Sequence, residues 1–291
     1  MTAREALLIE PRQRDIGNLS VNRLLPYRHR RAVGPFVFFD QMGPVGFGPG
    51  TGLDVLPHPH IGLATLTYLI DGEITHRDSL GTEQVIRPGD VNWMTAGCGI
   101  VHSERTPPAL RSAGGTLNGL QIWIGLPAAE EERAPAFEHH GAADLPVLDV
   151  GGAQMRVIAG AAFGTQAPVS VFSDMFFIDA DCPASAAFDL PSDLGERALY
   201  VLEGRVSVAD RTIGPGNMLV LEDGVAARIA ATHEPARVVL LGGAPLDGDR
   251  HMWWNFVSSS RERIEQAKAD WREGRFDPVP GETEFVPLPG T

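Results

Sequence analysis

The sequence predicts an all-β protein built from two β-barrel, jelly-roll-like domains, with one short helix near its C-terminal end. Three observations support this class. The 291 residues include 33 glycines and 23 prolines, a composition that favours short strands and turns over a helical bundle. Runs with β-like composition alternate with turn signals in both halves of the chain. Parts of the first half also recur in the second half.

The first β-rich region covers residues 34–123. Its apolar and β-branched runs are 36–39 (FVFF), 64–70 (ATLTYLI), 84–86 (QVI) and 120–124 (LQIWI). Turn signals separate these runs, and Asp71-Gly72 is the clearest because glycine adopts a positive φ at little cost. We therefore expect hairpins packed into a barrel.

The composition changes at residues 128–140, where three consecutive glutamates precede Pro135. We interpret this segment as a short surface connector between two halves. The following β-like runs are 155–158 (MRVI), 175–179 (MFFID), 199–202 (LYVL) and 237–241 (RVVLL). The predicted domains are residues 1–130 and residues 131–291, with the helix and tail in the second.

Two segments of the first half reappear in the second half. The sequence YLIDG at 68–72 resembles YVLEG at 200–204, and RPGDV at 87–91 resembles GPGNM at 214–218. Such a long-range repeat indicates one barrel unit used twice.

Residues 260–273 carry the helical pattern. Ser259 and Glu262 have capping-box spacing, and Gly274 is a stop signal. The proline-rich residues 276–291 are expected to lie over the surface of the protein.

Composition also limits the cellular setting. The net charge of -13 argues against a general affinity for nucleic acid or an anionic membrane surface. Two cysteines, Cys98 and Cys182, make no disulfide framework, which favours a reducing compartment. The N-terminal residues lack a secretory pattern, and no apolar run approaches the roughly 20 residues that span a bilayer. We expect a soluble cytoplasmic protein.

Four residues form the strongest functional pattern. His58 and His60 are separated by one residue, as are His102 and Glu104. Residues i and i+2 of a strand point to the same face, so two strands facing one barrel interior would bring all four together. Three imidazoles and a carboxylate suit a divalent transition metal with open coordination positions. The alternative, in which the histidines lie in a loop and a turn, leaves the complete ligand set to coincidence.

The metal-ligand pattern does not repeat in the second half. The positions that correspond to His58 and His60, counted back from Gly204, hold Leu190 and Ser192. The second barrel is therefore predicted to lack this metal site.

These residues resemble the motifs of the cupin superfamily and, more specifically, of the pirin family. The first cupin motif is matched in spacing by Gly52, His58, His60, Thr65 and Gly72, and the second by Gly89-Asp90, Gly97 and His102. The segments that resemble pirins are 35–40 (PFVFFD), 57–62 (PHPHIG) and 93–104 (WMTAGCGIVHSE). The resemblance covers nearly the whole chain and is strongest between residues 34 and 123.

The resemblance implies a bicupin fold with one metal ion, Fe(II), in the N-terminal barrel. The implied ligands are His58, His60, His102 and Glu104. Thr65 stands where many cupins carry a glutamate ligand, and Cys98 stands where pirins often carry arginine. Imidazole and carboxylate ligands also accept manganese, cobalt, nickel, copper or zinc, so the metal stays open.

The resemblance also implies quercetin 2,3-dioxygenase activity, with a flavonol-like molecule and dioxygen as partners. In that case Glu104 is the catalytic residue that accepts the proton of the flavonol hydroxyl. The alternative is a non-enzymatic, iron-dependent regulator that binds a transcription factor or a metabolic enzyme. The same ligands serve both hypotheses, and neither involves direct nucleic-acid or membrane binding.

Several other residues have an ordinary structural interpretation beside a functional one. His76 is either a support for a metal ligand or, as we favour, a structural histidine, and Arg77 with Asp78 suggests a surface ion pair. Cys98 is either a redox reporter or an inert loop residue. Two adjacent pairs are interpreted as a helix anchor and as solvated connector residues, and these are Trp253-Trp254 and His139-His140.

Overall fold

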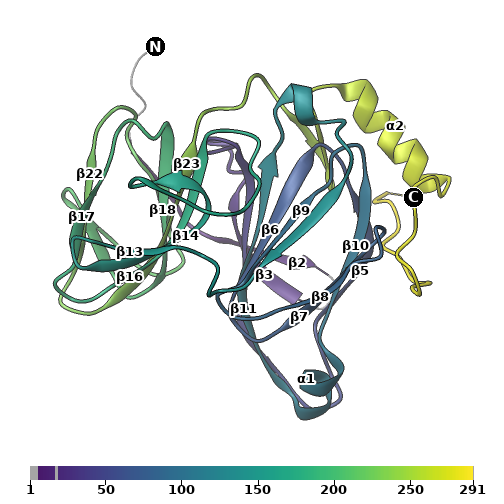
Figure 1. Ribbon diagram of the computed structural model, residues 1–291, viewed down its shortest axis with the longest axis horizontal. Helices are drawn as coiled ribbons and strands as arrows, with labels where there is room; N and C mark the ends of the chain where they lie inside the picture. Colours follow the sequence, from purple (N-terminus) through teal and green to yellow (C-terminus); the bar gives the residue numbers. More distant parts are fainter. Residues whose placement is uncertain (1–5, 17–18, 291) are drawn as a thin grey trace. The chain divides into compact units, whose positions relative to one another are not determined.

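The computed structural model describes residues 6–16 and 19–290, and these residues form mainly antiparallel β-sheet (Figure 1). Their α-helices are α1 (Pro108–Ala113) and α2 (Arg261–Arg272). The prediction of an all-β, two-barrel protein with a short C-terminal helix is confirmed. The short α1 was not predicted; it has Pro107 at its N-cap position and Gly114 after its last residue.

Contacts divide the chain into two compact units that interleave along the sequence. The histidine unit comprises Gln13–Val21, Phe39–Ala142 and Leu246–Thr291, and the companion unit comprises Met1–Arg12, Asn22–Phe38 and Ala143–Pro245. Each unit is assembled from three separate segments of the chain, whereas the domains predicted from the sequence are the continuous ranges 1–130 and 131–291. The predicted division at residue 130 is not tested by this and stays a prediction.

Two sheets contain the strands that concern the candidate site. The four-stranded sheet has the order β5 (Asp54–His60), β10 (Ile100–Arg105), β7 (Ile74–Asp78), β8 (Glu83–Ile86). The larger sheet has the order β12 (Ala136–His140), β9 (Val91–Thr95), β6 (Leu63–Asp71), β11 (Gly115–Gly125), β4 (Phe36–Phe47), β3 (Leu19–Leu25), β2 (Arg12–Ile16). Strand β10 therefore has β5 on one side and β7 on the other.

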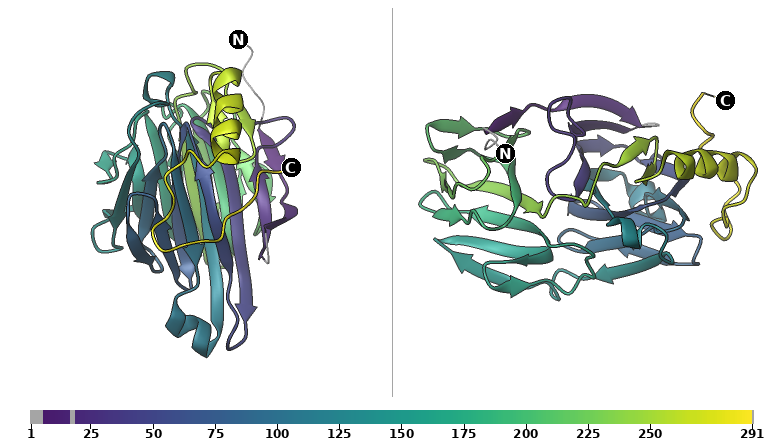
Figure 2. Two further views of the ribbon diagram at one scale, coloured as in Figure 1. Left: turned by 90° about the vertical axis from the view of Figure 1, so that its right-hand side faces the viewer. Right: turned by 90° about the horizontal axis from the view of Figure 1, so that it is seen from above.

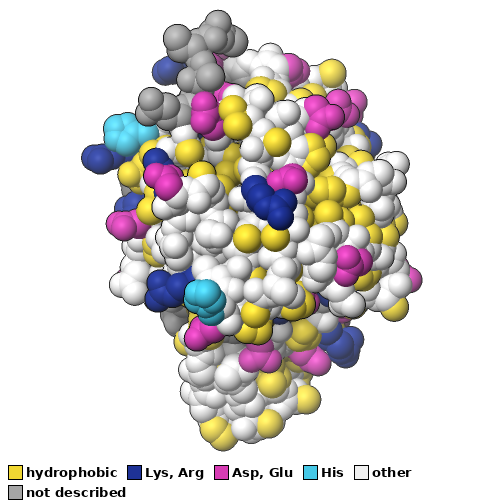
Figure 3. All heavy atoms as spheres, turned by 90° about the vertical axis from the view of Figure 1, so that its left-hand side faces the viewer, with side chains coloured by type: hydrophobic (Ala, Val, Ile, Leu, Met, Phe, Trp, Pro, Cys, Tyr) yellow, Lys and Arg dark blue, Asp and Glu magenta, His cyan; other side chains and the backbone are white. Residues whose placement is uncertain are grey.

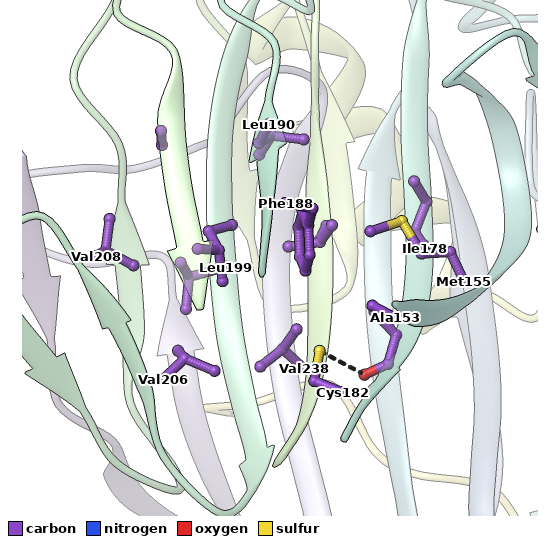
Figure 4. Packing of buried hydrophobic residues seen from close by; sticks show 14 of the residues in the cluster. Ala153, Met155, Ile178, Cys182, Phe188, Leu190, Leu199, Val206, Val208 and Val238 are labelled. Atoms are coloured by element: carbon purple, nitrogen blue, oxygen red, sulfur yellow. Dashed lines mark hydrogen bonds between the residues drawn. The ribbon is translucent and has the colours of Figure 1, made fainter. Parts of the chain in front are cut away.

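The companion unit also contains two sheets. One has the order β1 (Leu7–Ile9), β21 (Met218–Val220), β18 (Glu196–Glu203), β23 (Ala236–Gly243), β16 (Met175–Cys182), β14 (Ala153–Ala162), β13 (Val147–Val150), with β15 (Thr165–Gln166) beside β14. The other has the order β17 (Ala187–Leu190), β22 (Ala227–Ala231), β19 (Val206–Val208), β20 (Arg211–Ile213). Apolar side chains fill this unit, with Phe188 and Leu190 among Leu199, Ile178 and Val238 (Figure 4). On the face drawn in Figure 3, cationic and acidic side chains are interspersed.

The predicted connector at 128–140 is more ordered than expected. It contains a 3-10 turn, η1 (Ala128–Glu130), and the edge strand β12, which pairs with β9. Glu131 is buried, and its carboxylate pairs with Arg250 at 2.7 Å and accepts the backbone N–H of Ser259 at 2.9 Å. The connector is thus bonded to the segment that leads into helix α2, which its acidic sequence did not suggest.

Helix α2 follows the predicted helical pattern, but its N-cap differs by one residue from the prediction. The hydroxyl of Ser260, rather than Ser259, accepts the backbone N–H of Arg263 at 3.2 Å. Ser259 instead donates its hydroxyl to Glu131 at 2.8 Å. The two neighbouring serines thus have different partners, Glu131 for Ser259 and the helix N-terminus for Ser260.

The segment around α2 closes one side of the histidine unit (Figure 2). The hairpin of β24 (His251–Trp253) and β25 (Phe256–Ser258) packs with the helix. Trp253 and Trp254 pack against Phe256, Ile264 and Ala267, which confirms their interpretation as a helix anchor. The C-terminal tail then returns to β5, where Val286 donates its N–H to the carbonyl of Pro57 at 2.8 Å.

Candidate metal centre

Strands β5 and β10 bring three histidines together. His58 and His60 are two residues apart on β5 and therefore point to the same face of the strand. The antiparallel register places His102 of β10 opposite His58. One ring nitrogen from each histidine lies within 4.8 Å of the other two. The three side chains are buried, with 7%, 1% and 1% exposure for His58, His60 and His102. We call these three residues the histidine cluster.

The hydrogen bonds of the cluster indicate which nitrogen of each ring is free. The Nδ1 atoms of His58 and His60 lie 2.8 Å and 3.2 Å from the carbonyl oxygens of Leu56 and Asn255. A carbonyl only accepts hydrogen bonds, so each Nδ1 carries the proton and each Nε2 keeps a lone pair.

His102 completes this pattern. Its Nδ1 lies 3.4 Å from Nδ1 of His76, and its buried Nε2 has no hydrogen-bond partner among the described residues. Leaving a buried polar atom without a partner is unfavourable by roughly 1–3 kcal/mol. A metal ion bound by the three imidazoles would remove that penalty, so the cluster suits a single metal ion.

Burial also keeps the cluster neutral. Loss of solvation lowers the pKa of His58 to about 4. It lowers the pKa values of His60 and His102 well below the usual range, and the neighbouring histidines add to the effect. Protons therefore compete little with a metal at neutral pH.

Glu104 lies two residues after His102, beyond an irregularity in the β5–β10 pairing. His102 is opposite His58, but Glu104 is opposite Val55, so β5 has one extra residue in this interval. Glu104 is buried and accepts a long hydrogen bond of 3.5 Å from the hydroxyl of Thr67, and it lies outside the 4.8 Å group of histidine nitrogens. Burial raises the pKa of Glu104 to about 7. Its assignment as a ligand and as a base stays a prediction.

The residues behind His102 differ from the sequence-based interpretation. Asp78 is fully buried and lies 3.0 Å from Nε2 of His76, whereas Arg77 pairs with Glu83. The expected Arg77–Asp78 surface pair is therefore wrong. Alternation explains this, because Arg77 points to the opposite face of β7 from its two neighbours. His76 contacts His102, a contact that depends on the pairing of β7 with β10.

The other candidates lie apart from the cluster. His139 and His140 are half-buried on β12, where Nδ1 of His139 lies 2.7 Å from the side-chain oxygen of Asn92. Cys98 is an exposed, free cysteine, and the interpretation as a redox reporter or as an inert loop residue is not decided by this. In the companion unit Leu190 is fully buried in the apolar core. Within the described residues, the histidine cluster is the group of side chains with metal-binding spacing.

Two β-barrels, one of which holds a buried triad of histidines, define the protein as a two-barrel member of the cupin class. The chain belongs to the pirin family. The pirin family model matches residues 18–124, and the model of the pirin C-terminal cupin domain matches residues 177–277. The bicupin fold implied by the motifs is confirmed.

Relatives with known names or structures support the same assignment. A pirin-like protein of Caulobacter vibrioides is 49% identical over 287 residues, which cover 97% of this chain and 99% of the relative. A Pseudomonas aeruginosa protein named "Putative quercetin 2,3-dioxygenase PA1205" is 44% identical, over 89% of this chain and 80% of its own. The crystal structure of a quercetin 2,3-dioxygenase from Acinetobacter baumannii has a TM-score of 0.89 and 34% identity, covering 99% of this chain and 97% of that one.

Neither α1 nor α2, the helices of the described chain, is long and apolar enough to cross a membrane.

Proposed function

We propose that this pirin is a mononuclear, iron-dependent dioxygenase that opens the ring of a flavonol, as a quercetin 2,3-dioxygenase does. The observation that carries the proposal is the histidine cluster, with three buried, neutral imidazoles whose Nε2 lone pairs are free. The names of the Pseudomonas and Acinetobacter relatives support the substrate class.

His58, His60 and His102 would hold the metal through Nε2, and Glu104 would be the fourth ligand. A bound divalent iron supplies Lewis acidity toward the flavonol oxygens and a redox partner for dioxygen. All four side chains are buried, with 1% exposure for His60 and His102 and only 7% and 8% for His58 and Glu104.

Glu104 takes the proton from the 3-hydroxyl of the flavonol. Burial raises the pKa of Glu104 to about 7 in the metal-free site, and a bound cation would lower it by favouring the carboxylate, the form that accepts a proton. The Thr67 hydroxyl, whose single proton can go to Gln121 at 2.9 Å or to Glu104 at 3.5 Å, places a polar group beside the carboxylate. The overall reaction converts one flavonol and one dioxygen into one depside and one carbon monoxide.

The test is an oxygen-triggered assay. Protein loaded with Fe(II) under anaerobic conditions is mixed with quercetin, oxygen is admitted, and the loss of flavonol absorbance is followed together with carbon monoxide release. We expect turnover by the wild type, and His58→Ala should lose both the iron and the activity. His139→Ala is the matched control, because this histidine lies on β12 outside the cluster.

Equal rates for wild type and His58→Ala would refute the dioxygenase assignment. If the wild type nevertheless binds iron and His58→Ala does not, that result favours the iron-dependent regulator instead.

A further inference from the structure

We propose that His76 and Asp78 are positioning residues that hold His102 in the one neutral tautomer that can bind a metal through Nε2. The inference rests on the metal centre within the proposed function and is independent of whether the centre oxidises a flavonol.

The three side chains form a continuous chain of contacts from β7 to β10. The register places His102 opposite Asp78, and Glu104 opposite His76. Nδ1 of His102 lies 3.4 Å from Nδ1 of His76, and Nε2 of His76 lies 3.0 Å from Oδ2 of Asp78. The ring of Phe137 stacks on His76 with centroids 4.4 Å apart and planes 19° apart, which restricts the imidazole to this orientation.

Asp78 determines which atom donates and which accepts in the two contacts that link Asp78, His76 and His102. Its Oδ1 accepts the backbone N–H groups of Leu80 and Thr82 at 2.9 Å and 3.0 Å, so the carboxylate is oriented and acts as an acceptor. An accepting Oδ2 requires the proton of His76 to be on Nε2.

The position of the proton on His76 in turn determines the position of the proton on His102. A neutral His76 with its proton on Nε2 has a lone pair on Nδ1, which accepts from Nδ1–H of His102. His102 in turn keeps its lone pair on Nε2, the buried atom that has no hydrogen-bond partner among the described residues.

His102 differs in this respect from the other two ligands. Backbone carbonyls of Leu56 and Asn255 hold the Nδ1 protons of His58 and His60. A side-chain substitution leaves those carbonyls in place. His102 depends on a side-chain acceptor, so its tautomer can be changed by mutation.

The decisive variant is Asp78→Asn. It keeps the shape of the side chain but replaces the acceptor oxygen that faces His76 with a donor NH₂ group. The asparagine oxygen can still accept from Leu80 and Thr82, and its NH₂ then faces Nε2 of His76. His76 must accept there and carry its proton on Nδ1, which forces His102 to carry its own proton on Nε2. We expect the affinity for Fe(II) to fall by about 10–100-fold, the range typical when a partner of a metal-ligating histidine is lost.

Two substitutions of His76 separate positioning from simple packing. His76→Gln keeps an acceptor oxygen for His102 and should retain most of the affinity. His76→Leu offers none and should lose affinity to a similar extent as Asp78→Asn. Arg77→Gln is the control, since Arg77 lies between the two residues but pairs with the exposed Glu83.

Two measurements are needed, and one of them requires no metal. Anaerobic competition with a chromophoric chelator gives the Fe(II) affinity. Nitrogen-15 NMR of metal-free protein labelled at histidine reads the tautomer, and we expect His102 as Nδ1–H in the wild type and as Nε2–H in Asp78→Asn.

Unchanged affinity together with an unchanged His102 tautomer in Asp78→Asn would overturn the proposal, as would an Nε2–H tautomer in the wild type. The spectrum itself reports whether each variant is folded. Failure of the oxygenase assay with intact iron binding would leave this inference standing.

Discussion

At the scale of single residues, burial lowers the pKa of the histidines and raises the pKa of Glu104. Loss of solvation disfavours the charged form, so it lowers the pKa of His58 to about 4 and raises that of Glu104 to about 7. The histidines are thereby ready to bind a cation, while Glu104 is close to half-protonated at neutral pH. A bound cation would favour the carboxylate form.

Glu104 should make the stability of metal-stripped protein depend on pH. The folded-state pKa of about 7 lies above the ordinary glutamate value of 4.5, so the folded protein retains a proton that the unfolded chain releases between these values. The neutral side chain favours the folded state below pH 4.5, and this contribution is lost as pH rises through 7. The neutral Glu104→Gln lacks this dependence. At about 1.4 kcal/mol per pKa unit, the variant should gain roughly 2–3 kcal/mol over wild type between pH 5 and pH 8.

Urea unfolding of chelator-treated protein at the two pH values measures this difference. The histidines contribute a pH dependence of the opposite sign in both proteins, so the difference between the two pH profiles, rather than either profile alone, is compared. Parallel pH profiles for the two proteins would contradict the shifted pKa of Glu104.

At the scale of elements, the C-terminal tail is bonded to the strand that carries His102. Glu282 accepts the hydroxyl of Ser103 at 2.5 Å and the guanidinium of Arg105 at 2.5 Å and 3.1 Å. Both donors are on β10, on either side of Glu104. The tail therefore supports the metal-site strand from outside, which extends its predicted role as a surface segment.

Loss of the charge at Glu282 should destabilise the protein. The Glu282 side chain is only 4% exposed, so Glu282→Gln weakens charge-assisted hydrogen bonds in a partly desolvated setting, and we expect a loss of about 1–3 kcal/mol. Glu284 pairs with the same Arg105 but is 63% exposed, so Glu284→Gln should cost less than about 0.5 kcal/mol.

The shift in the urea midpoint, at unchanged slope, measures both effects. Equal losses for the two variants would show that burial does not distinguish the two carboxylates.

At the scale of the whole molecule, the two related barrels differ in the side chains that fill their interiors. The histidine cluster lies in the histidine unit, whereas the companion unit has an apolar core that includes Leu190 at the position corresponding to His58. An apolar, close-packed core offers no lone pairs to a cation.

We therefore expect one metal ion per chain. Elemental analysis of protein purified without chelators should give a ratio near one, and the double variant His60→Ala/His102→Ala should give a ratio near zero. His139→Ala should keep the wild-type ratio. A ratio near two, or metal retained by the double variant, would contradict a single centre.

The sequence by itself determined the fold class, the repeat of the barrel and the set of three histidines that the structure brings together. These features rest on local rules, since alternation along a strand follows from backbone geometry and turn signals from the φ preferences of glycine. Motif resemblance added the family.

Only the tertiary structure decided which neighbours the local elements meet. The pairing of β7 with β10 places His76 against His102, and the buried Asp78 turns toward His76 instead of Arg77. Glu131 bonds Ser259, whereas Ser260 caps the helix. These contacts join residues far apart in the chain, and their partners depend on strand register and packing, which no short sequence window contains.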